Sequence, residues 1–248
     1  AIYVYNQEYT VEGVSYCRRG FLCSQVLSRF GEGKVFPHEE TLSAAKADRL
    51  MLMYTTKANL SPVFGLYPDA ECEAQNLLDA YVADKTPLVA TDHLGVVHKL
   101  WPVTDVAVIS KLSAVMGPKP LFIADGHHRY ETACNYRDEL ANGGKLAANH
   151  PANGVLMMCV AMDDPGLIVM PTHRLFKGVP ALTSAELTAK LEPFFSVKPA
   201  GEGPETAKTV WEEIETAGEQ GSIGLYTQKD GKWVIATLTE AGKARMAE

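Results

Sequence analysis

Residues 120–132 read PLFIADGHHRYET, in which an apolar run passes abruptly into a polar segment with two histidines. A continuous apolar run of this length is typical of a buried β-strand. The segment that follows is expected to form a helix over residues 127–140, ended by a pair of glycines. Between the two, Asp125 is a natural helix N-cap and Gly126 lets the backbone approach a ligand closely. The sequence therefore predicts a strand, a sharp turn and a helix around one polar centre.

The first turn of the expected helix carries three basic or potentially basic side chains, those of His127, His128 and Arg129. A helix N-terminus already bears about half a positive charge, so each cation there is disfavoured by roughly 0.3–1 kcal/mol. Free backbone N–H groups, an arginine and two imidazoles together favour an anion, and phosphate is the commonest such anion. Glu131 either holds one imidazole in a single tautomer or forms an exposed helical pair. The pattern predicts a phosphate site.

Two further polar segments are candidates for the same site. Residues 37–41 read PHEET and precede an expected helix, whose N-terminus favours the carboxylates but does not account for the histidine. Residues 171–174 read PTHR and repeat the His-Arg pair at the end of an expected strand, where loops commonly deliver functional side chains. Lys46 and Arg49 belong either to this group or to a solvated helix face. The candidates from the two segments are His38, Glu39, Glu40, Thr41, His173 and Arg174.

The composition indicates an ordinary globular protein and argues against several classes of function. Of the 248 residues, 46% are hydrophobic and 21% are charged, and the formal net charge of -7 disfavours binding to nucleic acid or to anionic membranes. The five cysteines include no C-x-x-C pair, so free thiols in a reducing cytosol are expected. The sequence has neither a signal peptide nor an apolar run of about 18 residues. A cytoplasmic protein without membrane contact is therefore expected.

The order of the expected elements indicates an α+β fold with a mixed sheet. Residues 1–180 contain the polar segments and are expected to form a ligand-site domain. Residues 181–248 are expected to form a smaller α/β region, in which helices accompany a hairpin around residues 229–232. The chain starts at Ala1 and enters a strand at once, so it is expected to be a fragment of a longer protein.

The segment ADGHHRYE at residues 124–131 resembles the hallmark of the domain of unknown function family 1015. Further blocks that resemble this family are FPHEET at 36–41, followed by Lys46, Asp48 and Arg49, then SPVFGLY at 61–67 and PTHR at 171–174. The resemblance covers most of residues 1–180. Family members are usually longer, and the N-terminal segment and lysine-bearing C-terminal block expected of them are not found in this sequence. The biochemistry of the family is poorly established, so the resemblance alone implies no activity.

A more distant likeness concerns DGHHR at residues 125–129, which is similar to boxes of the partition-protein-B, sulfiredoxin and free-serine-kinase superfamily. This likeness implies a ParB/sulfiredoxin-like core in which a helix N-terminus binds nucleotide phosphates. The serine kinases also have a PHEE-like stretch whose glutamate is the catalytic base. Residues 37–40 match that stretch, which implies that the base is Glu39 or, by a one-residue ambiguity, Glu40. The long gap from this stretch to Asp125 departs from their pattern.

Three hypotheses of function follow. The first is a phosphotransferase or phosphohydrolase that acts on serine, phosphoserine or a similar metabolite, with Mg²⁺ and ADP or ATP as cofactors. The second is a non-catalytic nucleotide-binding switch, for which Glu39 is dispensable. The third is a metal-dependent hydrolase with ligands His127, His128, His173 and Asp125. It ranks last because adjacent helical residues diverge by about 100°, and because the H-x-x-x-H spacing of helical zinc sites is missing.

The first hypothesis gives each candidate a role. Glu39 is the expected base, Asp125 caps the helix or holds Mg²⁺, and His128 takes part in catalysis. The residues expected to bind phosphate are Gly126, His127, His128, Arg129, His173 and Arg174. The residues expected to support them are His38, Glu40, Thr41 and Glu131. No metal centre held by the protein alone is expected, and the substrate, the direction of transfer and the oligomeric state stay open.

Overall fold

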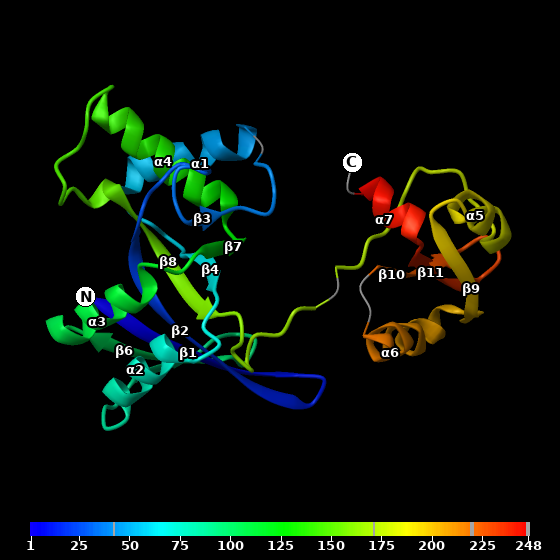
Figure 1. Cartoon of the computed structure of the whole chain (residues 1–248), viewed down its shortest axis with the longest axis horizontal. Helices are drawn as coiled ribbons and strands as arrows, with labels where there is room; N and C mark the ends of the chain where they lie inside the picture. Colours follow the sequence, from blue (N-terminus) through cyan, green and yellow to red (C-terminus); the bar gives the residue numbers. More distant parts are fainter. Residues whose placement is uncertain (42, 171, 219–220, 247–248) are drawn as a thin grey trace. The chain divides into compact units, whose positions relative to one another are not determined.

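The computed structural model describes residues 1–41, 43–170, 172–218 and 221–246, and the chain divides into two compact units, Ala1–Met170 and Pro171–Glu248 (Figure 1). The last strand of the first unit ends at Ala161 and the first helix of the second unit begins at Ser184. The described residues between these two positions contain no helix or strand. The boundary predicted near residue 180 lies in this same irregular segment.

The first unit is built on one eight-stranded sheet. Its strands are β1 (Ile2–Val11), β2 (Val14–Val26), β3 (Val35–Phe36), β4 (Val63–Tyr67), β5 (Leu88–Thr91), β6 (Val97–Val103), β7 (Leu121–Asp125) and β8 (Gly154–Ala161). They lie in the order β3-β7-β4-β8-β2-β1-β6-β5. The pairs β3–β7 and β4–β8 are parallel and the other neighbours are antiparallel. The predicted α+β class with a mixed sheet is confirmed, whereas the ParB/sulfiredoxin-like core stays a prediction.

A long hairpin of β1 and β2 lies near the middle of this sheet. The strand β2 begins at Val14, well before the apolar residues of its second half. The turn residues Glu12 and Gly13 both have positive φ angles, 50° and 82°, and such a turn matches the twist of the strands it joins. Polar residues such as Arg18 and Arg19 extend β2 because its backbone pairs with β1.

Two helix pairs pack on the sheet and share one hydrophobic core with it (Figure 1). The helix α1 (Ser43–Thr56) packs against α4 (His127–Ala141), and α2 (Glu73–Val82) packs against α3 (Val106–Met116). Strand residues such as Val4, Val63 and Ile123 are buried beneath them, because alternate side chains of a strand point to one face. This packing fixes α4, and hence its N-terminus, directly beyond the end of β7. In the described part of the chain, no helix is both long enough and apolar enough to cross a membrane.

The second unit contains a small antiparallel sheet in the order β10-β11-β9. Its elements are α5 (Ser184–Leu191), β9 (Phe195–Glu202), α6 (Ala207–Ala217), β10 (Ser222–Thr227), β11 (Lys232–Leu238) and α7 (Glu240–Met246). The strands β10 and β11 form the hairpin that the sequence predicted around residues 229–232.

The close approach of β2 to β8 predicts that Gly20 tolerates no side chain. A Cβ atom at Gly20 would lie 2.4 Å from the carbonyl oxygen of Cys159 and 2.8 Å from Cγ2 of Val160. We expect Gly20→Ala to lower the free energy of unfolding in urea by about 1–3 kcal/mol, the usual cost of overpacking. Gly144→Ala is the control, since its Cβ would meet nothing closer than the carbonyl oxygen of Ala141 at 3.4 Å. Equal effects of the two substitutions would contradict this view of the sheet.

Candidate functional site

Gly126 makes the turn between β7 and α4. It takes the N-cap position of α4 with a φ angle of 96°, and a Cβ atom there would lie 2.9 Å from Nε of Arg129. The prediction that Asp125 caps the helix is wrong, because no side chain caps α4. The Asp125 carboxylate instead forms an ion pair with Arg129, one turn further along. The pair has the i,i+4 spacing that brings two side chains together on a helix.

Arg129 ties the start of α4 to the loop before β4. Its Nη1 atom donates hydrogen bonds to the carbonyl oxygen of Pro62 and, over 3.1 Å, to the hydroxyl of Ser61. Its Nη2 atom donates to Asp125, whose side chain is 74% exposed, whereas that of Arg129 is only 21% exposed. The guanidinium is therefore held in one place by three partners, and part of it reaches solvent.

His127 is a buried, neutral imidazole rather than an exposed cation. Its residue exposure is 1%, and its Nε2 atom accepts a hydrogen bond of 3.2 Å from the backbone N–H of His38. This assigns the proton of the neutral ring to Nδ1. Burial lowers the pKa of His127 below its ordinary value of 6.5, and neighbouring His38 adds to this effect, while Glu39 and Asp125 oppose it. The ring is thus uncharged at neutral pH.

The loop at residues 38–39 packs against this imidazole. The ring of His38 meets that of His127 edge-on, with centroids 4.4 Å apart, and His38 Nε2 lies 3.3 Å from the carbonyl oxygen of Ala124. An oxygen of Glu39 lies 3.0 Å from His127 Nδ1, a distance that suits a hydrogen bond although the direction of approach does not. The Glu39 side chain is 54% exposed, so its carboxylate also faces solvent. The structure thereby brings His38 and Glu39 to the turn, while Glu40 is exposed.

Glu131 contacts the same segment from the next turn of α4. It accepts hydrogen bonds from the Thr41 hydroxyl and, over 3.5 Å, from Lys46 Nζ. Glu131 was expected to hold the ring of His127 or of His128, and among the contacts of the described residues its carboxylate is instead engaged by Thr41 and Lys46. Glu131 therefore holds α1 and its preceding loop onto α4.

The other predicted residues lie in different surroundings. His128 is half-buried on the first turn of α4. His173 and Arg174 belong to the second unit, where His173 meets Trp211 edge-on and Arg174 donates a 3.4 Å hydrogen bond to the carbonyl oxygen of Thr172. Their part in the phosphate site stays a prediction, and Pro171 lies outside the described residues.

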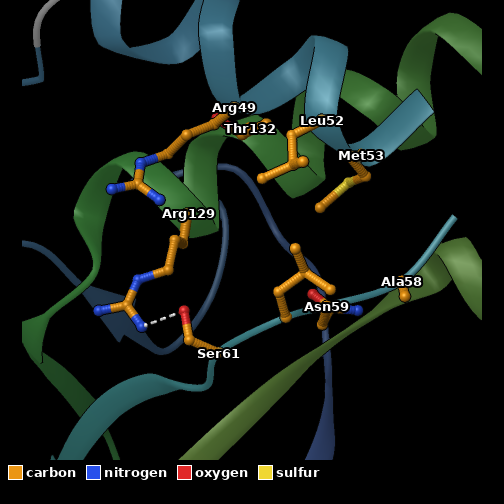
Figure 2. Close-up of a pocket in the computed structure, with 9 residues that line it drawn as sticks. Arg49, Leu52, Met53, Ala58, Asn59, Ser61, Arg129 and Thr132 are labelled. Carbon is orange, nitrogen blue, oxygen red and sulfur yellow. Dashed lines mark hydrogen bonds between the residues drawn. The ribbon is translucent and has the colours of Figure 1, made fainter. Parts of the chain in front are cut away.

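A pocket that the sequence did not predict lies between α1, α4 and the loop before β4 (Figure 2). It has a volume of about 50 Å³. We call it the Arg49 pocket, and the lining residues that bear on its chemistry are Arg49, Leu52, Met53, Ser61, Arg129 and Thr132. From the sequence, Arg49 was assigned either to the functional site or to a solvated helix face. The structure places it in the lining of this pocket, where α1 packs on α4.

The hypothesis of a metal-dependent hydrolase gains no support from this geometry. Within the residues that the structure describes, no three His, Cys, Asp or Glu side chains are placed to hold a metal ion. Asp125 is engaged by Arg129, and both ring nitrogens of His127 face other groups.

A family model described as "Protein of unknown function (DUF1015)" matches residues 1–247. No curated protein and no solved structure matches the chain. The family predicted from ADGHHRYE and its accompanying blocks is confirmed. The likeness to the partition-protein-B and sulfiredoxin superfamily stays a prediction.

The lowered pKa of His127 predicts a loss of stability in mild acid. The unfolded chain takes up a proton at this position as the pH falls through 6.5, and the folded chain resists doing so. The unfolded state then binds more protons, so folding is destabilised as the pH falls. We expect the stability difference between wild type and His127→Gln to shrink between pH 7.5 and 5.5 in urea titrations.

The exposed His93 provides the matched control, because His93→Gln should leave the pH dependence of the wild type in place. Should His127→Gln not fold, NMR titration of the His127 ring in the wild type replaces it, with an expected midpoint below 6.5. A midpoint at or above that value would contradict the neutral, buried assignment.

Proposed function

The chain belongs to the family described as protein of unknown function DUF1015, and we propose that it binds a phosphate-bearing small ligand or nucleotide at the β7–α4 turn and acts there as a phosphotransferase or phosphatase. The observation that carries the proposal is the pair of Glu39 and His127, a solvent-facing carboxylate 3.0 Å from a buried neutral imidazole, set beside the N-terminus of α4. Serine and phosphoserine are the first substrates to test, from the resemblance of the PHEE stretch to that of free serine kinases.

Anion binding is supported by the groups that surround the turn. The first backbone N–H groups of a helix have no partner within the helix, and the dipole of α4 favours negative charge there. Gly126 carries no Cβ atom, which leaves room for the Arg129 guanidinium to lie against the turn. Arg129 adds a guanidinium whose orientation Asp125, Ser61 and Pro62 fix. A fixed fork of donors loses little entropy when it binds a phosphate.

Phosphoryl transfer also needs a base, and Glu39 is placed for that role. An oxygen of the Glu39 carboxylate lies 3.0 Å from Nδ1 of His127, and the side chain is 54% exposed, so the carboxylate can reach a ligand at the turn. In the reaction, the hydroxyl oxygen of the acceptor forms a bond to phosphorus while the bond to the leaving oxygen breaks. The leaving group keeps that electron pair, and Glu39 takes the hydroxyl proton. With water as the acceptor, the same residues give hydrolysis.

Magnesium fits this proposal as an ion that arrives with the nucleotide. Mg²⁺ is commonly held by one or two carboxylates together with substrate phosphates and water. The exposed carboxylate of Asp125 is suited to such a contact, but its ion pair with Arg129 competes with it. Mg²⁺ would neutralise charge on the phosphates, and the chain's own residues would orient the ligand and accept the proton.

Binding is tested by calorimetric titration of Mg-ADP and Mg-ATP into the whole chain and into Arg129→Gln. Loss of a charge-assisted contact is expected to weaken saturable binding by about 10-fold to 100-fold. Lys145→Gln is the matched control, because it removes one positive charge just beyond the other end of α4 and should bind as the wild type does. Circular dichroism establishes that each variant is folded. Equal affinities of the Arg129 and Lys145 variants would contradict the placement of the phosphate.

Catalysis is tested by ³¹P NMR of phosphoryl transfer from ATP or ADP to serine, and of phosphoserine hydrolysis. Glu39→Gln should lower the rate by about 100-fold or more, the usual worth of a positioned base, while nucleotide affinity is kept. Glu40→Gln is the neighbouring control and should retain turnover, since Glu39 and not Glu40 forms the described contact with His127. Nucleotide binding by a wild type that turns over neither substrate would favour the non-catalytic switch.

A further inference from the structure

The Arg49 pocket holds more positive charge than its surroundings neutralise. Figure 2 shows the guanidinium groups of Arg49 and Arg129 extending in the same direction from α1 and α4. Arg129 has a carboxylate partner in Asp125, but among the described residues no carboxylate forms an ion pair with Arg49. Two guanidinium groups that line one pocket place like charges in the same region, and a bound anion would offset their repulsion. The charge pattern therefore suits a bound oxyanion.

A second observation at the same place is independent of charge. Thr132 is 1% exposed and lines the pocket, and its Oγ1 atom is buried without a hydrogen-bond partner in the described structure. A helical threonine usually bonds to a carbonyl of the preceding turn, and a buried hydroxyl without a partner costs about 1–3 kcal/mol. Because Oγ1 is closed to water, an oxygen atom of a ligand in the pocket accepts this missing bond only when a covering side chain shifts.

The size and the remaining lining restrict what can enter. A volume of about 50 Å³ holds a few water molecules, since one water needs about 10–15 Å³ of such space. A group as small as phosphate fits this space. The side chains of Leu52 and Met53 form an apolar side that offers no bond to a polar ring. Ser61 contributes a hydroxyl that already orients Arg129.

We propose that the Arg49 pocket is the seat of the terminal phosphate of a small phosphomonoester, gripped by the guanidinium groups of Arg49 and Arg129, with the organic part of the ligand outside it. The inference rests on the proposed function, because it assumes that a phosphate-bearing ligand binds at Arg129. It adds that the phosphate lies on the side of Arg129 that faces α1, and that the phosphate group alone suffices for recognition. Inorganic phosphate is therefore a competent probe.

The test is a titration of inorganic phosphate and of phosphoserine into the whole chain, followed by calorimetry. Arg49→Gln should weaken both ligands by about 10-fold or more, because a charge-assisted fork is lost. Arg49→Lys keeps the charge without the fork and should give an intermediate affinity. Lys145→Gln, which removes an exposed charge near the C-terminal end of α4, should stay within about twofold of the wild type.

Thr132→Val provides a second variant with opposite effects on stability and on binding. Valine keeps the shape of the side chain and removes the unpartnered hydroxyl, so the ligand-free protein should resist thermal unfolding at least as well as the wild type. Affinity for phosphate should nevertheless fall several-fold, since the bond from Oγ1 is lost. A variant that is less stable and binds phosphate as before would contradict the role given to Thr132.

The outcomes distinguish a phosphate seat in the Arg49 pocket from the proposed binding of a phosphate-bearing ligand at the β7–α4 turn. If Arg129→Gln loses phosphate while Arg49→Gln binds it as the wild type does, the phosphate site lies at the turn and the Arg49 pocket is not its seat. If the wild type binds neither phosphate, phosphoserine nor Mg-nucleotide, both the proposed function and this inference fail. If a nucleotide binds but phosphate and phosphoserine do not, the inference fails and the proposed function stands.

Discussion

The contact between the buried imidazole of His127 and the loop at residues 38–39 is the constraint on which the candidate site depends. It joins the segment before α1 to the turn between β7 and α4, two regions far apart in the sequence. The backbone N–H of His38 satisfies Nε2 of the buried ring, and the Glu39 carboxylate of the same loop lies 3.0 Å from Nδ1. The loop is thereby held against the turn, and Glu39 is brought to it.

Arg129 organises the other side of the turn in a comparable way. Its three partners are Asp125 at the end of β7 and Ser61 and Pro62 in the loop before β4. The guanidinium therefore links the end of β7 to the start of β4. Thr41, Lys46 and Glu131 close the remaining edge by attaching the start of α1 to α4. The polar groups of these segments thus form a connected set around α4, which the hydrophobic core beneath holds in place.

The strand, turn and helix at residues 121–141 could be predicted from the sequence, because a local apolar run and a glycine are sufficient signals. The partners of Asp125 and Glu131 could not, since an N-cap, a helical pair and a tertiary ion pair all use the same carboxylate. The early start of β2 could not be predicted either, because the polar residues there gain their strand conformation from pairing with β1. The Arg49 pocket exists only through the packing of α1 on α4, which no local pattern encodes.

The unpartnered hydroxyl of Thr132 has a consequence for which residue selection favours at this position. Selection for a stable fold alone favours valine at this position, since a buried methyl group costs nothing where a lone hydroxyl does. On the inference that Thr132 donates to a bound ligand, a member of the family that had lost the ligand would be expected to exchange this threonine for valine.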